Sequence, residues 1–425
     1  MSGVRRSVRS ILVVTPMMWV VLGCAGATPS TSQGGGPSPS ASTATPIASP
    51  AGSIAASPPP TSAPTVAPAT QEPCIESGDQ QAINASLQSS DSAVLCPGAV
   101  FNLTAPVMVV ADGQRIYTAG HPTDDTRATL RIVSASQTAA VVMRDYSGVV
   151  LSNVIIDGNR RHLGPLSGDA LVYAGGYADG QVIRDTRIMN TRSWSSLHLI
   201  QGHSSSQACT SALVEDNEIG PAGTSDELLW ADGISLACSN STVRRNLIVD
   251  ATDGGIVIFG APGSLVEHNT IRAETRTLLG GINMVDFDPY DGSYAGTVVR
   301  DNVIAASGAV IRIGLGMGPR VWGCLPSNAS NDTVRGGTVT GNTLKGPLMQ
   351  YGYAVDGVRD WTVTGNVDRA KHSGRPSTDC DGSVAARPDG FQLTPARAQG
   401  VFQPEFVNGR LDLALWAIVA PRPGS

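Results

Sequence analysis

The sequence predicts an all-β protein whose strands wind into a solenoid. Glycine accounts for 48 of the 425 residues and only 15% of the residues are charged, a balance that argues against long helices and coiled coils. A short pattern, V-x-x-N-x-I, returns at intervals of 23 to 40 residues, and self-similarity at such a period is typical of solenoids. The residues around each copy are β-branched and are separated by Gly and Asn, as in short strands. Together these observations favour a right-handed parallel β-helix with several strands in each turn.

Residues 1–23 are predicted to be a signal peptide. The apolar stretch Ile11–Leu22, 12 residues long, is too short to span a membrane but has the length of a signal-peptide core. Three basic residues precede it: Arg5, Arg6 and Arg9.

Cys24 follows Gly23 directly after the apolar stretch, and this arrangement resembles the lipobox of bacterial lipoproteins. The resemblance implies that Cys24 is lipidated and becomes the new N-terminus, which would anchor the protein in the cell envelope outside the cytoplasm. Leu22 departs from the small residue usual at its position. Ordinary secretion, with cleavage after Ala27, is the alternative.

Residues 24–72 are predicted to form a disordered linker. No Asp, Glu, Lys or Arg occurs from Ser10 to Gln71, and the linker consists almost wholly of Ser, Thr, Pro, Ala and Gly. Its apolar surface is too small to offset the entropy that ordering would cost. The folded domain is therefore expected over residues 73–425.

Copies of the repeated pattern define the regular coils, which we expect over residues 97–368. Identical side chains in stacked coils lie about 4.8 Å apart, and an Asn amide can both donate and accept along such a stack. The Asn residues are therefore predicted to be structural. The first and fourth positions of the copies are Val150/Asn153, Ile183/Thr186, Val214/Asn217, Val243/Asn246, Val266/Asn269, Val299/Asn302, Val339/Asn342 and Val363/Asn366.

Both ends of a solenoid need a cover, because an open end would pair with other chains. Residues 79–90 are predicted to form an N-terminal cap helix, with Ala82, Ile83 and Leu87 on one face. Asp368 stands where the last copy of the pattern should have Ile. Residues 369–425 are therefore expected to form a C-terminal cap.

Six cysteines remain besides Cys24, and an even number in an exported chain predicts three disulfides. Cys209 and Cys238 each lie 8 residues before the Asn of a copy, so adjacent coils should bring them to disulfide distance. The other expected pairs are Cys74–Cys96 and Cys324–Cys380. No cysteine or histidine cluster has zinc spacing, so no structural zinc is expected.

Residues 73–366 resemble the pectin-lyase-like β-helix superfamily, which contains polysaccharide lyases and glycoside hydrolases. The opening, from Ala82-Ile83-Asn84 through Val107–Val110 to Ile116-Tyr117, is similar to the entry helix and first coil of that family. The stretch 281–322 is similar to uncharacterised secreted β-helix proteins. The resemblance implies a fold, whereas function has to be argued from the site.

Alternation along the strands between the copies predicts one column of outward-facing side chains. If pairs such as Leu197 and Leu199 face the core, the residues between them face solvent on five successive coils. Such a column is about 19 Å long, which suits a short oligosaccharide. The predicted column consists of His198, Ser235, Val257, Asn283 and Arg312.

Two Asp-Gly pairs open adjacent strands of this face. The segment 231–235 resembles a polygalacturonase motif that carries an acidic residue at the position of Asp232. The double Asp of that family is here Thr252-Asp253 and its Gly-His-Gly is absent, so its mechanism is not carried over. Asp232 and Asp253 remain a candidate acid/base pair, in which burial under Leu228–Trp230 would raise the pKa of Asp232 while a more open setting leaves Asp253 ionised. The alternative is that both Asp-Gly pairs are turns.

The remaining candidates concern binding. Trp230, like Trp194, precedes a strand of the face and could stack on a sugar; burial under a loop is the alternative. His198, Asn283 and Arg312 are predicted to contact the ligand, together with Asp286. Asp286, Asp288 and Asp291 could also bind Ca²⁺, although such loops are usually only solvated; no other cofactor is expected.

The sequence favours a cell-surface carbohydrate-active protein, a lyase or hydrolase acting on a polysaccharide in a groove. The alternative is a non-catalytic module that binds glycans or partner proteins, and the sequence leaves open whether the protein is an enzyme. A net charge of −6 argues against nucleic acid as a partner. We expect a monomer that meets the membrane through its lipid anchor only.

Overall fold

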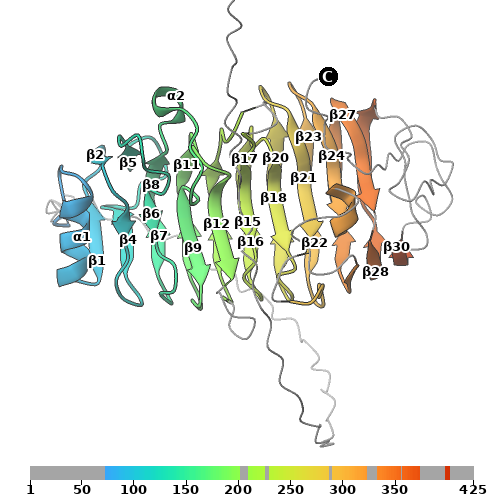
Figure 1. Cartoon of the computed structure of the whole chain (residues 1–425), viewed down its shortest axis with the longest axis horizontal. Helices are drawn as coiled ribbons and strands as arrows, with labels where there is room; N and C mark the ends of the chain where they lie inside the picture. Colours follow the sequence, from blue (N-terminus) through green and yellow to red (C-terminus); the bar gives the residue numbers. More distant parts are fainter. Residues whose placement is uncertain are drawn as a thin grey trace, which may run out of the picture. The chain divides into compact units, whose positions relative to one another are not determined.

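The structure is a computed structural model that describes residues 72–201, 209–224, 229–286, 290–322, 333–355, 357–373 and 398–402. Nearly all of its regular elements are strands, and every strand pair is parallel. Each coil contributes one strand to each of three rows, and Figure 1 shows the coils stacked side by side along the domain. The predicted parallel β-helix is confirmed.

The first row forms a sheet of its own, in which strands pair only with the same row of the neighbouring coils. In order of pairing it contains β1 (Ser92–Leu95), β4 (Arg115–Thr118), β7 (Val150–Ser152), β10 (Val182–Arg184), β13 (Leu213–Glu215), β16 (Thr242–Arg244), β19 (Leu265–Glu267), β22 (Val298–Arg300), β26 (Thr338–Thr340), β28 (Val358–Thr364) and β25 (Val334–Arg335), with β30 (Ala398–Phe402) beside β28.

The second and third rows meet at a corner of each coil and share one strand, β27 (Thr343–Val355). The second row contains β2 (Val100–Leu103), β5 (Ala128–Ile132), β8 (Val154–Asp157), β11 (Arg187–Met189), β14 (Glu218–Ile219), β17 (Leu247–Val249), β20 (Thr270–Ala273), β23 (Val303–Ala306), β27 and β29 (Val367–His372). The third row contains β3 (Val107–Met108), β6 (Val141–Val142), β9 (Val172–Gly176), β12 (Ser195–Gln201), β15 (Asp232–Leu236), β18 (Gly254–Phe259), β21 (Leu278–Val285), β24 (Ile311–Met317) and β27.

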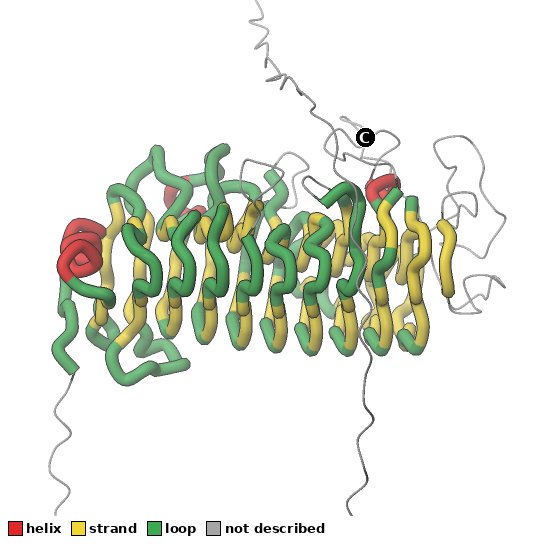
Figure 2. The backbone as a smooth tube through the Cα atoms, turned by 90° about the horizontal axis from the view of Figure 1, so that it is seen from below, coloured by secondary structure: helices red, strands yellow, loops and turns green. Residues whose placement is uncertain are grey.

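Helices are few among the described residues. α1 (Gln80–Ser89) begins after Asp79, whose carboxylate accepts a hydrogen bond from the backbone N–H of Gln81 and so caps the helix. Ile83 and Leu87 are buried in the core, and Figure 2 shows α1 against one end of the stack. The predicted N-terminal cap helix is confirmed. α2 (Arg160–Leu163) and the 3₁₀ helix η1 (Pro319–Trp322) lie in loops. No described helix has the length and apolar character that crossing a bilayer would need.

The interior of the stack is a column of β-branched and leucine side chains, one set per coil. In β16 the central Val243 is buried while its neighbours are half-exposed, and the same alternation recurs along the first row. Val243 pairs with Val214 on one side and with Val266 on the other, as the repeated pattern predicts. Each coil thus buries its apolar residues only against its neighbours.

A continuous asparagine ladder runs beside this core. The amide Nδ2 of each Asn donates to the Oδ1 of the Asn on the next coil at 2.9 Å. Each Nδ2 also donates to a backbone carbonyl, so both amide hydrogens are used, as at Asn246 and Val214. The ladder consists of Asn217, Asn246, Asn269, Asn302, Asn342 and Asn366. Their predicted structural role agrees with these contacts.

The first copy of the pattern lies one residue out of register from the prediction. Leu151, not Val150, pairs with Ile183. Asn153 has a left-handed backbone (φ 53°), and its amide donates to the carbonyls of His121 and Pro122 instead of joining the ladder. In the observed frame Val154 stands at the asparagine position, so the pattern matched only in the frame that the structure does not adopt.

A column of glycines runs through the strands of the third row. A Cβ on Gly233 would lie 2.6 Å from the carbonyl oxygen of Gly255 on the next coil. Likewise, a Cβ on Gly255 would lie 2.6 Å from the carbonyl oxygen of Gly281, and a Cβ on Gly281 would lie 2.5 Å from that of Gly314. Only glycine permits coils to approach this closely.

Two of the three predicted disulfides lie within the described residues. Cys74–Cys96 ties the chain before α1 to the first coil, with Cα atoms 5.0 Å apart. Cys209–Cys238 joins adjacent coils, with Cα atoms 4.6 Å apart. Both pairs fit an extracytoplasmic location. Cys324 and Cys380 lie outside the described residues, as do Cys24 and the predicted linker.

The C-terminal boundary is only partly visible. Asp368 pairs with Leu344, so it does occupy the position of the missing Ile, and β29 continues beyond it to His372. Its carboxylate accepts a hydrogen bond from the His372 imidazole at 2.9 Å. Most of the predicted cap, residues 369–425, lies outside the described residues.

Candidate functional site

The third row of strands carries the predicted outward column over four coils. His198 on β12 pairs with Ser235 on β15, Ser235 with Val257 on β18, and Val257 with Asn283 on β21. The alternation of strand residues therefore placed these four side chains in one column. The expectation that they face solvent is wrong, because all four are buried. At the N-terminal end Tyr173 on β9 continues the column beside His198.

Arg312 does not belong to this column, and its predicted place there is wrong. Asn283 pairs with Gly316, four residues further along β24, while Ile313 pairs with Gly280. The prediction aligned Ile311 and Ile313 with the inward pair of β21, but a strand period of two is equally satisfied by a shift of four residues. The glycine column, which stacks Gly281 against Gly314, fixes the true register.

Asp232 lies at the start of β15 and belongs to a second column on the same face. It pairs with Ser195 on β12. Its Oδ2 accepts a hydrogen bond from the Ser235 hydroxyl at 2.8 Å, and its Oδ1 accepts one from the Gly254 backbone N–H at 3.0 Å. The Ser235 hydroxyl also lies 2.8 Å from that of Ser195, so a buried chain of hydroxyls leads to the carboxyl group.

Asp253 directly precedes Gly254, on the coil next to Asp232. Burial, followed by the charge of Asp253, raises the pKa of Asp232 well above its ordinary value, against the opposing hydrogen bonds from Ser235 and Gly254. Burial also raises the pKa of Asp253, to about 6. The expected direction for Asp232 is confirmed. Asp253 is half-buried, so its setting is more open than that of Asp232, as expected, although its pKa is raised as well. The carboxyl of Asp253 has no hydrogen-bond partner among the described residues.

His198 is a neutral imidazole held between aromatic rings. Its ring stacks on Tyr173 at 5.7 Å between centroids and meets the indole of Trp194 edge-on at 4.3 Å. Burial, and to a smaller extent the charge of Arg144, lower the pKa of His198 to about 3. Its ring nitrogens have no hydrogen-bond partner among the described residues. His198 is therefore uncharged at neutral pH and can donate or accept through one nitrogen.

Asn283 and Asp286 both come from β21 or its end and are buried. The Asn283 side chain lies directly over Gly280, since a Cβ there would come within 1.9 Å of its Oδ1. That Oδ1 atom is buried and has no hydrogen-bond partner among the described residues. Such an acceptor is costly to leave unpaired.

The predicted calcium loop does not come together among the described residues. Asp286 is buried, whereas the Asp291 side chain is 78% exposed and lies 3.5 Å from the guanidinium of Arg335. Asp288 lies outside the described residues. No group of three acidic, histidine or cysteine side chains in the described part of the chain could hold a metal ion.

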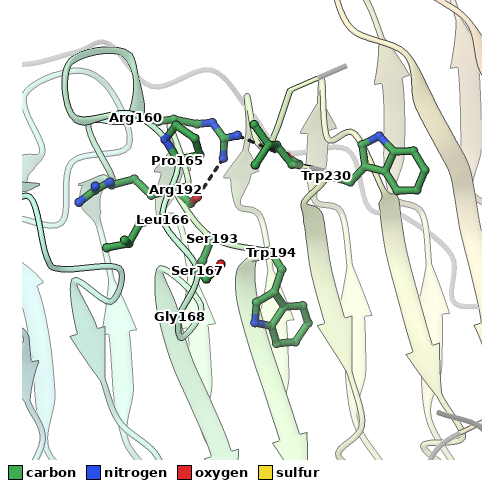
Figure 3. Close-up of a pocket in the computed structure, with 10 residues that line it drawn as sticks. Arg160, Pro165, Leu166, Ser167, Gly168, Arg192, Ser193, Trp194 and Trp230 are labelled. Carbon is green, nitrogen blue, oxygen red and sulfur yellow. Dashed lines mark hydrogen bonds between the residues drawn. The ribbon is translucent and has the colours of Figure 1, made fainter. Parts of the chain in front are cut away.

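A pocket of about 400 Å³ opens beside the starts of β12 and β15. Figure 3 shows two arginines, Arg160 and Arg192, on one side of it and the two tryptophans, Trp194 and Trp230, on the other. Trp194 is 41% exposed, which rules out burial under a loop, and Trp230 is half-buried. Both predicted aromatic residues thus border one cavity next to the candidate carboxyl pair.

Comparison with known proteins supports the fold. A family model described as a right handed beta helix region matches residues 177–368. These residues form a right-handed β-helix. The resemblance to pectin-lyase-like β-helix proteins is thereby confirmed at the level of fold. No curated protein matches the chain in sequence.

Several solved structures share the β-helix at low identity. An alginate lyase from Paenibacillus sp. str. FPU-7 is 15% identical over 70% of this chain and 97% of its own, with a TM-score of 0.45. DFA-IIIase from Arthrobacter chlorophenolicus A6 without its lid is 13% identical over 79% and 97%, with a TM-score of 0.47. The surface protein and adhesin PfbA of Streptococcus pneumoniae is 10% identical over 69% and 92%, with a TM-score of 0.43. At these values the function of the β-helix has to be argued from its own residues.

Three contributors to the site were missed by the sequence reasoning: Tyr173, Ser195 and Arg160. Ser195 precedes His198 by three residues, as Asp232 precedes Ser235, and this shared spacing was a usable signal. Tyr173 lies on β9, in a coil for which the sequence reasoning named no strand of this face. Arg160 lies in a loop, where neither period nor motif indicates what a side chain contacts.

Proposed function

We propose that the protein is an extracytoplasmic carbohydrate-active enzyme, a lyase or glycoside hydrolase that acts on a polysaccharide over β12, β15, β18 and β21. One observation carries the proposal: Asp232, which is buried, and Asp253, which is half-buried on the adjacent coil, are carboxyl groups whose pKa values are both raised. Paired carboxyls with shifted proton affinities are the usual means of acid/base catalysis near neutral pH.

The two carboxyls differ in a way that suits different roles. Asp232 is the more deeply buried group and is made harder to ionise by burial and by the charge of Asp253, which suits the role of the acid. Asp253 ionises near pH 6 and has no described partner for its carboxylate. In a hydrolysis Asp232 would protonate the departing glycosidic oxygen, and Asp253 would take a proton from the attacking water.

Aromatic and neutral polar groups beside the pair support binding of a sugar. Trp194 offers an exposed indole face, on which the apolar face of a sugar ring can stack. The uncharged His198 supplies hydrogen-bonding atoms without fixed charge. Asp286 and Arg312 lie further from this cluster, and we assign them no more than a place at its edge.

A non-catalytic glycan-binding module is the second candidate, and the contacts of Asp232 favour it. Both oxygens of that carboxyl already accept hydrogen bonds from the protein, as in a structural carboxyl group. Binding would then depend on the exposed Trp194 and not on the carboxyl pair.

Activity on a panel of polysaccharides separates the two candidates. Asp232→Asn and Asp253→Asn should each lose about 10²–10⁴ in turnover, the usual contribution of an acid or base, while the melting temperature does not fall. Asp360→Asn, at a side chain that is 75% exposed, is the matched control and should leave turnover unchanged. Wild-type turnover in both site variants would exclude the enzyme, and glycan binding that is lost only in Trp194→Ala would establish the binding module.

The extracytoplasmic location follows from the disulfides, and we propose a lipid anchor at Cys24 with residues 25–72 as a spacer. The anchor rests on the similarity of residues 22–24 to a lipobox. It would hold the β-helix at the outer face of a membrane, where polysaccharides are accessible.

A further inference from the structure

The pocket beside α2 contains positive charge that the carboxyl pair does not use. Its wall includes Arg160 and Arg192 together with Ser167, Trp194 and Leu229. No Asp or Glu belongs to the part of the wall that the structure describes. The pocket is therefore positively charged, whereas the neighbouring site of Asp232 and Asp253 is acidic.

Arg192 is fully occupied by the protein. Its guanidinium has five N–H groups, and each donates to a backbone carbonyl. The acceptors are Gly164, Ser134, Gln137, Ala135 and Leu163. Arg192 thus fixes the loops that form the pocket wall and contributes its charge, but it has no donor left for a ligand.

Arg160 is different, because it keeps unused donors. It is only 8% exposed, and its Nη1 donates to the carbonyls of Thr191 at 3.1 Å and Arg192 at 3.0 Å. One hydrogen of its Nη2 donates to the Leu229 carbonyl at 3.3 Å. Nε and the second hydrogen of Nη2 have no partner among the described residues, and Figure 3 shows the guanidinium at the pocket wall.

The surroundings of Arg160 are electrically unbalanced. Burial, followed by the charges of Arg276 and Arg192, lowers its pKa, and no nearby described carboxylate acts in the opposite direction. Arg276 already has partners in the protein: its Nη1 donates to the Gly223 carbonyl, and its charge interacts with the carboxylate of Asp250. A buried cation without a counter-ion is costly, and a bound anion would offset that cost.

We propose that this pocket binds an oxyanion group of a ligand, a carboxylate or a sulfate, through the free Nε and Nη2 hydrogens of Arg160. Two adjacent N–H groups of a guanidinium match the two oxygens of such a group. The exposed face of Trp194 lies at the same pocket and can contact the body of the ligand. The site needs no catalysis by Asp232 or Asp253, so it stands independently of the proposed function.

Calorimetric titration of the full chain tests the site and distinguishes its ligands. D-glucuronate should bind, and D-glucose, which has the same ring without the carboxylate, should not. Inorganic sulfate is the third probe. If sulfate binds more weakly than glucuronate does, the ligand is an acidic sugar. If the two bind equally well, the pocket is a site for free anions. Absence of binding by both anions would overturn the proposal. Asp360→Asn, at an exposed position outside the pocket and the carboxyl pair, should bind glucuronate like wild type.

Three variants locate the binding. Arg160→Gln should weaken glucuronate binding about tenfold or more, as expected for a charge-assisted hydrogen bond. Arg161→Gln is the matched control, since Arg161 has the same charge but is exposed and does not line this pocket. Ser167→Trp, at an exposed position of the wall, should block binding without touching the carbonyl contacts of Arg160.

Two results would contradict the assignment to Arg160. One is binding that survives both Arg160→Gln and Ser167→Trp. The other is binding that appears only after Asp226→Asn and Glu227→Gln, since that would mean that these residues, which lie outside the described part of the chain, already neutralise the pocket.

Discussion

Two carboxyl groups on adjacent coils make the folded protein sensitive to their ionisation. Asp232 and Asp253 both lose water on folding, and an ionised Asp253 opposes ionisation of Asp232. A carboxyl whose pKa is raised in the folded state binds its proton more tightly there than in the unfolded chain. Its contribution to stability is therefore complete below the unfolded pKa and disappears as the pH rises through the folded one.

Removing the titration of Asp253 should stabilise the protein at neutral pH. The pKa of this group rises from 3.8 to about 6, so the wild type loses stability between these pH values. Asp253→Asn mimics the protonated form and should be more stable than wild type by about 3 kcal/mol at pH 7, from about 1.4 kcal/mol per unit of pKa. The gain should vanish below pH 4. Urea unfolding at a series of pH values measures the difference.

Asp360→Asn again serves as the control, because its exposed side chain loses little water on folding. The difference between Asp360→Asn and wild type should stay small from pH 4 to pH 7. If Asp253→Asn instead destabilises the protein at pH 7, its carboxylate is held by favourable contacts and the electrostatic account of the pair fails.

At the scale of the element, the asparagine ladder pairs backbone hydrogen-bonding groups beside the second row of strands, as capping side chains do at the ends of helices. Each amide uses both hydrogens and its oxygen within the stack. A substitution must therefore supply two donors and an acceptor in the same volume, which no other residue of this size does. The constraint explains why Asn recurs at this position through coils of unequal length.

Asn269→Asp tests the ladder with an almost isosteric change. The substitution removes the two Nδ2 hydrogens that in the wild type donate to the Asn302 Oδ1 and to the Val243 carbonyl. It also places a carboxylate oxygen against the Asn302 oxygen. We expect a loss of about 3 kcal/mol in the free energy of unfolding, since buried groups left unpaired cost about 1–3 kcal/mol each. Denaturant unfolding of the two proteins measures the loss.

The exposed Asn240 provides the comparison, since its amide makes one contact, to the Thr210 hydroxyl at 3.3 Å. Asn240→Asp should change stability by less than about 0.5 kcal/mol. Equal effects of the two substitutions would show that the ladder contributes no more than a surface asparagine.

At the scale of the whole molecule, the sequence predicted the stacking of coils well. Valine at the first position of the pattern and asparagine at the fourth identify the register from Val214 to Val363 because each has one physical reason to be there. The prediction was wrong where residue type was ambiguous. Val150 fitted the pattern one residue early, and Arg312 fitted an alternation that cannot distinguish a shift of four residues.

The site was predictable only where it lies on strands. Strand alternation put His198, Ser235 and Asn283 in one column, and the Asp-Gly pairs pointed to the carboxyl groups. The effect of burial on Asp253 and the pocket around Arg160 depend on loops folded over from distant coils. No local period in the sequence carries that information.

The proposed anchor predicts where the whole protein resides in the cell. Cys24→Ala removes the acceptor of the lipid and should move the protein from the membrane fraction to the soluble one, since a lipid chain contributes most of the affinity for a membrane. Cell fractionation with immunoblotting detects the shift, and mass spectrometry of the N-terminus identifies the lipid. A wild-type protein that is already soluble and begins after Ala27 would contradict the anchor.

The glycine column also limits the errors that the chain can make while it folds. Next to each of these glycines lies the carbonyl of the following coil, at a distance that no side chain tolerates. A coil that slipped by one residue would place Ile234, Ile256 or Ile282 against that carbonyl and could not close. Such a slip would also turn Ser235 and Asn283 toward the apolar core, so steric exclusion and the cost of burying polar groups oppose it together. Each folded coil thereby allows the next coil to pair in one register only. The glycines, which have no side chain, are the residues that set this register.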